Sequence, residues 1–361
     1  MQVAPRRHDE RSWMCGHARL HHARAHSTTA RVLRRAALAA LLALAPAGAA
    51  GAADCRGTDM LAAMSRSSPD VYREIQDTAR ATANAEAILW KIERAGVPAS
   101  YLLGTIHLTD RRVTQFSAKT SQALDAVRSV ALEVTDISAA ATSAALEKSS
   151  RLVLYTDGRR LDGVLSAAEI AKVRATLSAA GMPVEISTMF KPWVISLMLS
   201  VSGCERRNVQ RGEPVLDMKL ATTARQRGKT IIGLETIESQ LQAMAAIPDD
   251  QQVGMLRASL AYADRADDNM ETLLQLYLQR RMGAAWPFQL ALARQAGVGP
   301  SAFVTFKQRI LVDRNRHMAK AALPLLSKGR VLIAVGAMHL VGDDGLVALL
   351  EDAGYTLTPI E

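Results

Sequence analysis

Two apolar segments of this 361-residue chain end in the same motif, and this repetition most constrains how the chain can fold. The first reads Tyr101-Leu-Leu-Gly104-Thr-Ile-His107, and the second reads Leu332-Ile-Ala-Val-Gly336-Ala-Met-His339. Each is an apolar run of strand length followed by Gly-x-x-His, which places an imidazole just beyond a buried strand. Open α/β sheets bind their ligands at the carboxyl ends of strands. We therefore expect both histidines on a rigid support at one edge of a sheet.

Other segments predict strands that alternate with helices, which is typical of a layered α/β domain. The predicted strands lie at 87–94, 100–107, 129–134, 229–234, 330–336 and 355–360. The predicted helices lie at 57–66, 69–83, 117–126, 303–326 and 343–353. Between Asp162 and Met282 the pattern is mostly helical, except for 229–234, which reads as a buried strand. Because no low-complexity linker follows residue 60, we expect residues 54–361 to form one domain.

The first 53 residues are expected to be an export segment outside the fold. Arg31-Val-Leu-Arg-Arg precedes ten uninterrupted Ala and Leu residues (36–45), and small residues then run to Ala53. This order is that of a secretory signal peptide cleaved near Ala53; the alternative is a buried Ala-rich helix. The apolar run is too short to span a bilayer, which needs about 20 residues. We expect a periplasmic or secreted protein with no stable membrane span, and residues 1–30 are either part of an unusually long leader or untranslated.

The formal net charge of +9 does not indicate a nucleic-acid-binding surface. Residues 1–53 carry a net charge of +6, and the rest of the chain holds 36 basic and 33 acidic residues. Aromatic residues, which stack bases in single-strand-binding proteins, make up only 4% of the chain. We therefore expect no nucleic-acid partner.

Two glutamates end apolar segments as the histidines do. Glu133 follows Val130-Ala-Leu, and Glu235 follows Ile231-Ile-Gly-Leu. A carboxylate at such a position is costly unless it is paired, solvated or bound to a metal; for Glu235 the alternative is an acid at the start of a helix. Two imidazoles and two carboxylates suit zinc, manganese or cobalt. Three of the four can hold the metal while one carboxylate acts as general base.

In their order along the chain, the motifs resemble those of the TraB/GumN family (TraB/PrgY/GumN), which also includes the Tiki metalloproteases of animals. They are Leu102-Leu-Gly-Thr-Ile-His, Gly233-Leu-Glu-Thr-Ile-Glu-Ser-Gln240, Arg314-Asn315 and Val335-Gly-Ala-Met-His-Leu-Val-Gly-Asp-Asp-Gly345. Erythromycin esterases and ChaN-like haem-binding proteins are similar more distantly. The resemblance implies a mixed α/β fold, with a central mixed sheet of two related halves, flanking helices and a long helical middle section. It also implies a metal-dependent hydrolase site at the paired motifs.

Four further residues are expected to support that site, and Arg314 is a further candidate catalytic residue. Gly104 and Gly336 let the backbone turn or let another group approach closely. Asp217 can orient a ligand histidine, or it lies in a first helical turn. Arg314 can bind a substrate carboxylate or stabilise a developing oxyanion, and Asn315 lies beside it; the alternative for Arg314 is a solvated helix face. His317, the third histidine after residue 53, is expected to be structural or exposed.

Two of the three cysteines, Cys55 and Cys204, follow the export segment, and Cys15 lies within it. In an oxidising compartment this pair can form one disulfide that closes a long loop. Two buried free thiols are the alternative.

These observations lead to one leading prediction and two alternatives. The leading prediction is an exported, peptidase-like hydrolase that uses Mn, Co or Zn and acts on a peptide or small acyl substrate. One alternative is a metal-free, esterase-like hydrolase in which a histidine is the general base. The other is a non-catalytic protein that binds a metal or haem, or that has a regulatory role.

Overall fold

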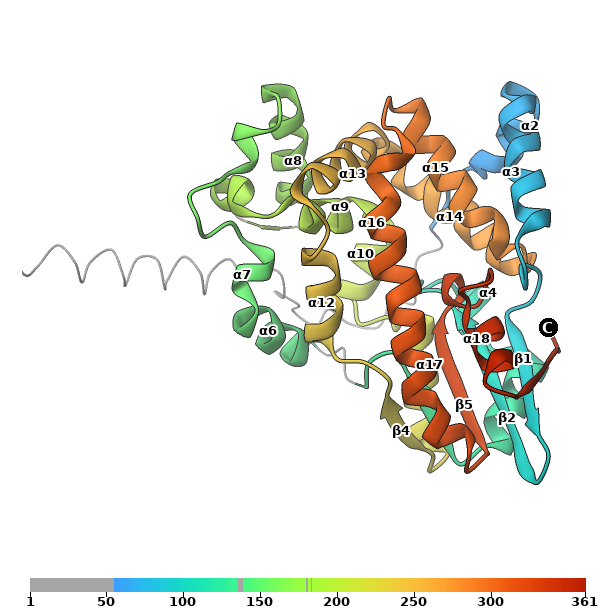
Figure 1. The fold of residues 1–361 in the computed structure, drawn as a ribbon. Helices are drawn as coiled ribbons and strands as arrows, with labels where there is room; N and C mark the ends of the chain where they lie inside the picture. Colours follow the sequence, from blue (N-terminus) through green and yellow to red (C-terminus); the bar gives the residue numbers. More distant parts are fainter. Residues whose placement is uncertain (1–54, 136–138, 180, 183) are drawn as a thin grey trace, which may run out of the picture.

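The computed structural model describes residues 55–135, 139–179, 181–182 and 184–361, and its strands form a six-stranded sheet (Figure 1). The sheet order is β4-β3-β5-β2-β1-β6. The strands are β1 (Leu89–Arg94), β2 (Val97–Thr105), β3 (Ser129–Leu132), β4 (Thr230–Gly233), β5 (Val331–Gly336) and β6 (Thr356–Pro359). The predicted mixed α/β fold is confirmed.

Four neighbouring strands of this sheet run parallel. β2 and β3 both pair in parallel with β5, and β4 pairs in parallel with β3. The antiparallel part consists of β1, which pairs with β2 on one side and β6 on the other. Because parallel strands share one direction, the carboxyl ends of β2, β5, β3 and β4 lie along the same edge of the sheet.

The central strand β5 is apolar along its length because both faces of the sheet are covered. Val331, Ile333 and Val335 pack on one face, with side chains from α17 and α18. Leu332 and Ala334 pack on the other face, with side chains from α5 and α11. The alternation of consecutive residues between two cores follows from the two-residue repeat of a strand.

The strand predicted at 229–234 is present, but the prediction that it is buried was wrong. β4 occupies this segment, but it lies at the end of the sheet and pairs only with β3. Its four residues are exposed or half-buried. An apolar sequence such as Ile231-Ile232 does not distinguish an edge strand from a central one, because the order of strands depends on the whole chain.

Helices surround the sheet and build a separate helical section. The helices are α2 (Met60–Ser67), α3 (Pro69–Ala81), α4 (Arg111–Thr114), α5 (Ala118–Ala126), α6 (Ala139–Lys148), α7 (Ser150–Val153), α8 (Ala167–Ala179), α9 (Pro192–Ser200), α10 (Gly203–Gln210), α11 (Leu216–Gln226), α12 (Ile237–Ala245), α13 (Asp249–Ala261), α14 (Ala266–Leu278), α15 (Ala285–Gln295), α16 (Val304–Phe306), α17 (Asp313–Leu326) and α18 (Leu346–Asp352). Side chains of α6 to α9 and α13 share a core of their own around Phe190 and Trp193. Figure 1 shows α6, α7, α8 and α9 away from the sheet.

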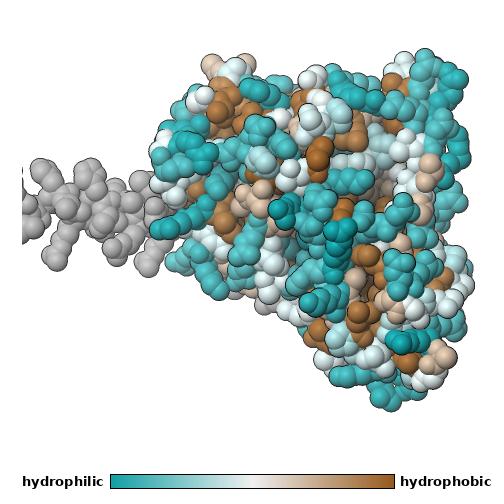
Figure 2. Space-filling model, viewed as in Figure 1, coloured by the Kyte–Doolittle hydropathy of each residue, from teal (hydrophilic) through white to brown (hydrophobic). Residues whose placement is uncertain are grey.

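The long helix predicted at 303–326 contains an irregular middle segment. α16 leads into a π-helical segment, η6 (Lys307–Val312), which continues into α17. Such segments occur frequently at functional sites. On the face shown in Figure 2, hydrophobic residues are scattered among hydrophilic ones, which is the usual mixture on a protein surface.

A disulfide joins Cys55 to Cys204 across 149 positions of the sequence. The alternative of two buried free thiols was therefore wrong. Within the described ranges, no helix combines the length and the apolar character needed to cross a membrane. The predicted export segment, with its cleavage site and Cys15, lies outside the described residues.

Gly104 in β2 is a position where an added methyl group is expected to disturb the packing. A Cβ there would lie 2.9 Å from both the Cα and the Cβ of Ala337, closer than carbon atoms normally approach. We expect Gly104→Ala to lower the free energy of unfolding by about 1–3 kcal/mol, measured by urea denaturation. Gly163→Ala is the matched control, because nothing lies within 4 Å of its added Cβ. Equal stability of the two variants would contradict this interpretation.

Candidate active site at the carboxyl ends of the parallel strands

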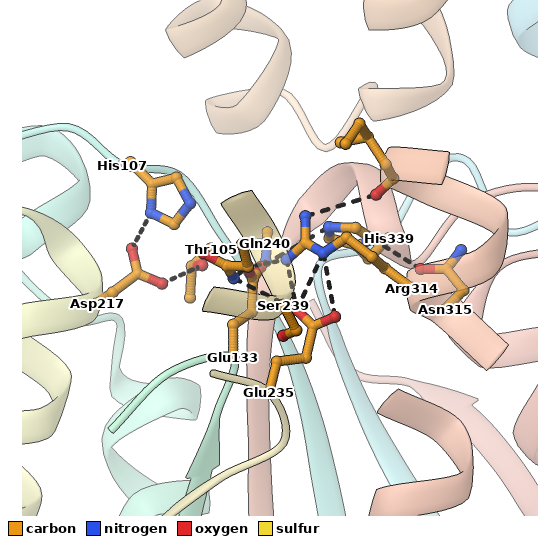
Figure 3. Close-up of polar contacts among 12 residues, drawn as sticks. Thr105, His107, Glu133, Asp217, Glu235, Ser239, Gln240, Arg314, Asn315 and His339 are labelled. Carbon is orange, nitrogen blue, oxygen red and sulfur yellow. Dashed lines mark hydrogen bonds and ion pairs between the residues drawn. The ribbon is translucent and has the colours of Figure 1, made fainter. Parts of the chain in front are cut away.

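Each of the four parallel strands is followed by one predicted site residue. His107 follows β2, Glu133 follows β3, Glu235 follows β4 and His339 follows β5. Figure 3 shows these side chains at the same edge of the sheet, together with Arg314 from α17. The backbone N–H of Glu235 donates to the carbonyl of Glu133 at 2.8 Å, so the two glutamates continue the pairing of their strands.

Arg314 lies between the two glutamates and pairs with both. Its Nη2 is 2.6 Å from Glu133 Oε2 and 2.7 Å from Glu235 Oε2, and its Nε is 3.0 Å from the same Glu235 oxygen. The side chains of Arg314 and Glu133 are largely buried, and that of Glu235 is only 2% exposed. The alternative of a solvated helix face for Arg314 was therefore wrong.

Glu133 is held ionised by the groups around it. Burial alone would raise the pKa of this carboxyl, but His339 in the protonated form that it takes at low pH, the charges of Arg314 and His107, and the N–H of Gly336 lower its pKa to about 2. The Gly336 N–H donates to Oε1 at 2.8 Å, so the glycine of the second motif contributes a backbone donor. A group with so low a pKa is a weak base near neutral pH.

His339 is buried and uncharged near neutral pH. Burial lowers the pKa of its imidazole to about 4. Asn315 donates through Nδ2 to the carbonyl of Asp344, so its Oδ1 is the atom that accepts from His339 Nδ1, at 2.7 Å. This assignment leaves Nε2 of His339 without a proton. That lone pair faces Glu133 Oε1 at 3.8 Å, so two acceptors face each other at a distance that suits a shared cation.

His107 differs from His339 in exposure and charge. Its side chain is 62% exposed, and Nδ1 lies 2.7 Å from Asp217 Oδ2. The negative charge of Asp217 raises the pKa of His107 to about 9. The hydroxyl of Thr105 donates to the other oxygen of Asp217 at 2.6 Å. Asp217 thus orients His107 through Nδ1, as predicted; carboxylates often orient metal-binding histidines in this way. Nε2, on the other side of the ring, is not part of this contact.

Two residues of the site, Gln240 and Thr105, were not predicted from the sequence. Gln240 donates through Nε2 to Glu133 Oε2 at 3.1 Å and to Glu235 Oε2 at 3.3 Å, and Thr105 supports Asp217. Gln240 lies in the first turns of α12, which starts with a capping box formed by Thr236 and Ser239. Thr236 is therefore the residue that caps this helix, and the alternative of a helix-start acid for Glu235 was wrong. The position of Gln240 at the end of the motif 233–240 was the signal that could have identified it.

A pocket opens beside these residues. It is lined by His107, Glu133, Asp217, Met218, Gln240 and Thr135 among others. The pocket brings His107, Glu133 and the start of α11 to one space.

Whether this site can hold a metal ion depends on the spacing of its side chains and on the donor atoms that they offer. Within the described ranges, no three His, Cys, Asp or Glu side chains are gathered closely enough to hold an ion. The donor atoms themselves fit, because Asp217 and Asn315 engage the Nδ1 atoms of His107 and His339 and leave both Nε2 atoms for another partner. Arg314 pairs with Glu133 through Oε2 only, so Glu133 Oε1 remains near His339, whereas Arg314 engages both oxygens of Glu235.

Comparisons with known proteins agree on one family. The model of the TraB/PrgY/gumN family matches residues 88–359. A "Metalloprotease TIKI homolog" of Nematostella vectensis is 24% identical over 320 residues, 75% of this chain and 66% of that protein. A protein of the same name from Amphimedon queenslandica is 28% identical over 181 residues, 45% of this chain and 36% of that protein. "Uncharacterized protein YbaP" of Escherichia coli (strain K12) is 26% identical over 158 residues, 44% of this chain and 55% of that protein.

The chain thus spans less than two thirds of the length of each of these relatives. No solved structure matches the chain.

The low pKa of His339 predicts a specific dependence of stability on pH. Between about pH 6.5, the pKa of an unfolded histidine, and about pH 4, the unfolded chain binds a proton that the folded chain does not. Stability must therefore fall as the pH falls through this window. In His339→Gln, we expect the free energy of unfolding to fall by about 2 kcal/mol less over this pH window than in the wild-type chain. The measurement is urea unfolding at several pH values with a chelator present. His317→Gln is the control, because His317 is exposed; a pH dependence unchanged in His339→Gln would contradict the assignment.

Proposed function

The chain belongs to the TraB/PrgY/gumN family, and we propose that it is a metal-dependent hydrolase that cleaves peptide bonds. The observation that carries this proposal is the pair of acceptors at the strand ends, the lone pair of His339 Nε2 and the ionised Glu133 Oε1, 3.8 Å apart. Two facing acceptors repel each other unless a cation or a donor lies between them. The relatives from Nematostella vectensis and Amphimedon queenslandica, each named "Metalloprotease TIKI homolog", support the reaction class.

The residues that would hold the ion are His107, His339 and Glu133, a set of two imidazoles and one carboxylate that suits manganese, cobalt or zinc. Binding would have to draw these three side chains closer together than they lie in the structure. When bound, such an ion lowers the pKa of a coordinated water molecule and polarises the carbonyl of the substrate. His339 is already in the neutral form that a ligand needs. His107 carries a proton up to about pH 9, so ion binding must release that proton and must strengthen as the pH rises.

The other charged groups have distinct roles in this proposal. Glu133 is too weak a base to take a proton from water near neutral pH, so we assign it to binding rather than to general-base catalysis. Arg314 pairs with both Glu133 and Glu235, so we assign it to holding these two carboxylates in place. Asp217 and Asn315 fix the orientation of the two imidazoles.

We propose further that the protein works outside the reducing cytosol, as the N-terminal sequence predicts. The disulfide between Cys55 and Cys204 supports this location, because structural disulfides persist in oxidising compartments.

The metal is tested by elemental analysis. After loading with manganese, cobalt or zinc and removal of free ions, the full chain is expected to retain about one ion per molecule. The His107→Ala/His339→Ala double variant is expected to retain none, because it lacks both imidazole ligands. His317→Ala is the control, and circular dichroism verifies that each variant is folded. Equal metal content in the double variant and the control would overturn the metal site.

Catalysis is tested separately with Glu133→Gln, which removes the carboxylate charge but keeps the shape of the side chain. We expect kcat on a peptide substrate library to fall on the order of a hundredfold. Glu351 is an exposed acid, so Glu351→Gln serves as the control and is expected to leave kcat unchanged. Hydrolysis that resists chelators would favour the metal-free esterase-like alternative. Metal binding without turnover in any form would favour the non-catalytic binding protein.

A further inference from the structure

The loop that carries His107 is held by a buried carboxylate next to the disulfide. Glu205, the residue after Cys204, is 4% exposed. Its Oε2 accepts the backbone N–H of Thr109 at 3.0 Å and the hydroxyl of Thr109 at 2.8 Å. Thr109 lies two residues after His107. A buried carboxylate requires such hydrogen bonds, so Glu205 and the start of this loop depend on each other.

Asn208, one turn further along α10, extends this contact to the disulfide. Its Nδ2 donates to the hydroxyl oxygen of Thr109 at 2.9 Å and contacts Cys55 Sγ at 3.5 Å. Asn208 is 1% exposed. The disulfide, Asn208, Glu205 and Thr109 therefore form one continuous set of contacts between the N-terminal segment, α10 and the His107 loop.

The other side of the disulfide is also fixed to the fold. Close to Cys55, the N–H of Thr58 donates to Asp268 Oδ1 and the N–H of Met60 donates to Thr272 Oγ1, both at 2.8 Å. Asp268 and Thr272 belong to α14. The disulfide thus links α10 to a segment that is bound to α14.

His107 needs such support because packing does little to hold its exposed ring. Apart from Glu205, the loop is held by Leu108, which is buried and whose carbonyl accepts from the N–H of Leu216 at 3.1 Å. Leu216 directly precedes Asp217, the partner of His107 Nδ1. The position of the imidazole therefore depends on the contact of Asp217 with His107, that of Leu216 with Leu108 and those of α10 with Thr109.

We propose that Glu205 is a positioning residue for His107, and that the Cys55–Cys204 disulfide keeps Glu205 in place, so that reduction of the disulfide loosens the His107 loop. The predicted effect on catalysis rests on the proposed function. The predicted effect on the order of the His107 loop does not depend on that function. A displacement of about 1 Å at a reacting group can cost a hundredfold in rate, so a loosened loop lowers kcat more than KM.

The first test compares Glu205→Ala and Glu205→Gln in the full chain. In Glu205→Ala, we expect hydrogen exchange of the peptide 106–110 to rise at least about tenfold and the NMR signal of the His107 ring, at one fixed pH, to shift or broaden. Glu205→Gln keeps an acceptor oxygen and is expected to restore most of the protection. The control is Glu169→Ala, since Glu169 Oε2 accepts the N–H and hydroxyl of Ser166 in the same way, far from His107 in the sequence.

The second test reduces the disulfide and needs no change at Glu205. Dithiothreitol treatment or Cys204→Ser is expected to raise exchange of the same peptide at least about threefold, while dithiothreitol has no further effect on Cys204→Ser. If Glu205→Ala does not fold, the reduced wild-type chain supplies the same readout. Unchanged exchange and an unchanged His107 signal in the reduced chain would overturn the role of the disulfide.

The outcomes separate this proposal from the proposed function. If hydrolysis is detected, Glu205→Ala is expected to lower kcat at least about tenfold with KM changed less than about threefold. If no form of the protein hydrolyses any substrate, a loosened loop in Glu205→Ala still supports the positioning role. An ordered loop and an unchanged His107 signal in Glu205→Ala would overturn it, whatever the activity.

Discussion

The ion pairs of Arg314 with Glu133 and Glu235 are the interaction on which the site depends. Parallel pairing of β3 and β4 brings the two glutamates to adjacent strand ends, joined by a backbone hydrogen bond. Two buried carboxylates at such positions repel each other and resist loss of water. The single guanidinium, 2.6 and 2.7 Å from the two carboxylates, pairs with both, leaves only one net negative charge, and ties α17 to the edge of the sheet. Asn315 follows in the same helix and fixes His339, so the placement of one arginine also places the second histidine motif.

The two histidines occupy different environments although they follow the same motif. His339 is buried and its pKa is lowered to about 4, whereas His107 is exposed and Asp217 raises its pKa to about 9. The difference arises from what surrounds each strand end. β5 lies in the middle of the sheet, and His339 beyond its end contacts Asn315 of α17, while His107 lies in a loop that lines the pocket. One imidazole is therefore a fixed neutral base, and the other is a charged group whose position depends on the loop that carries it.

The sequence predicted the strands and the strand-end residues because both depend on local patterns. Apolar runs bounded by glycine located β2 and β5, and the polar residue that ends each run located His107 and His339. The ion pairs of Arg314 could not be predicted in this way, because they join positions 79 and 181 residues apart. Gln240 was missed because its role depends on the direction in which α12 leaves β4. The burial of β4 was predicted wrongly because its place at the edge of the sheet depends on the order of all the strands.

The central claim is that Arg314 stabilises the fold only because two carboxylates need its charge, and a double-mutant cycle in urea unfolding tests it most directly. Removal of one partner from a buried ion pair typically costs about 3–5 kcal/mol, because the other charge is left unpaired. We therefore expect Arg314→Met to lower the free energy of unfolding by about that amount. We expect Arg314→Met with Glu235→Gln to recover at least about 1 kcal/mol of this loss. Strictly additive effects of the two substitutions would contradict the account.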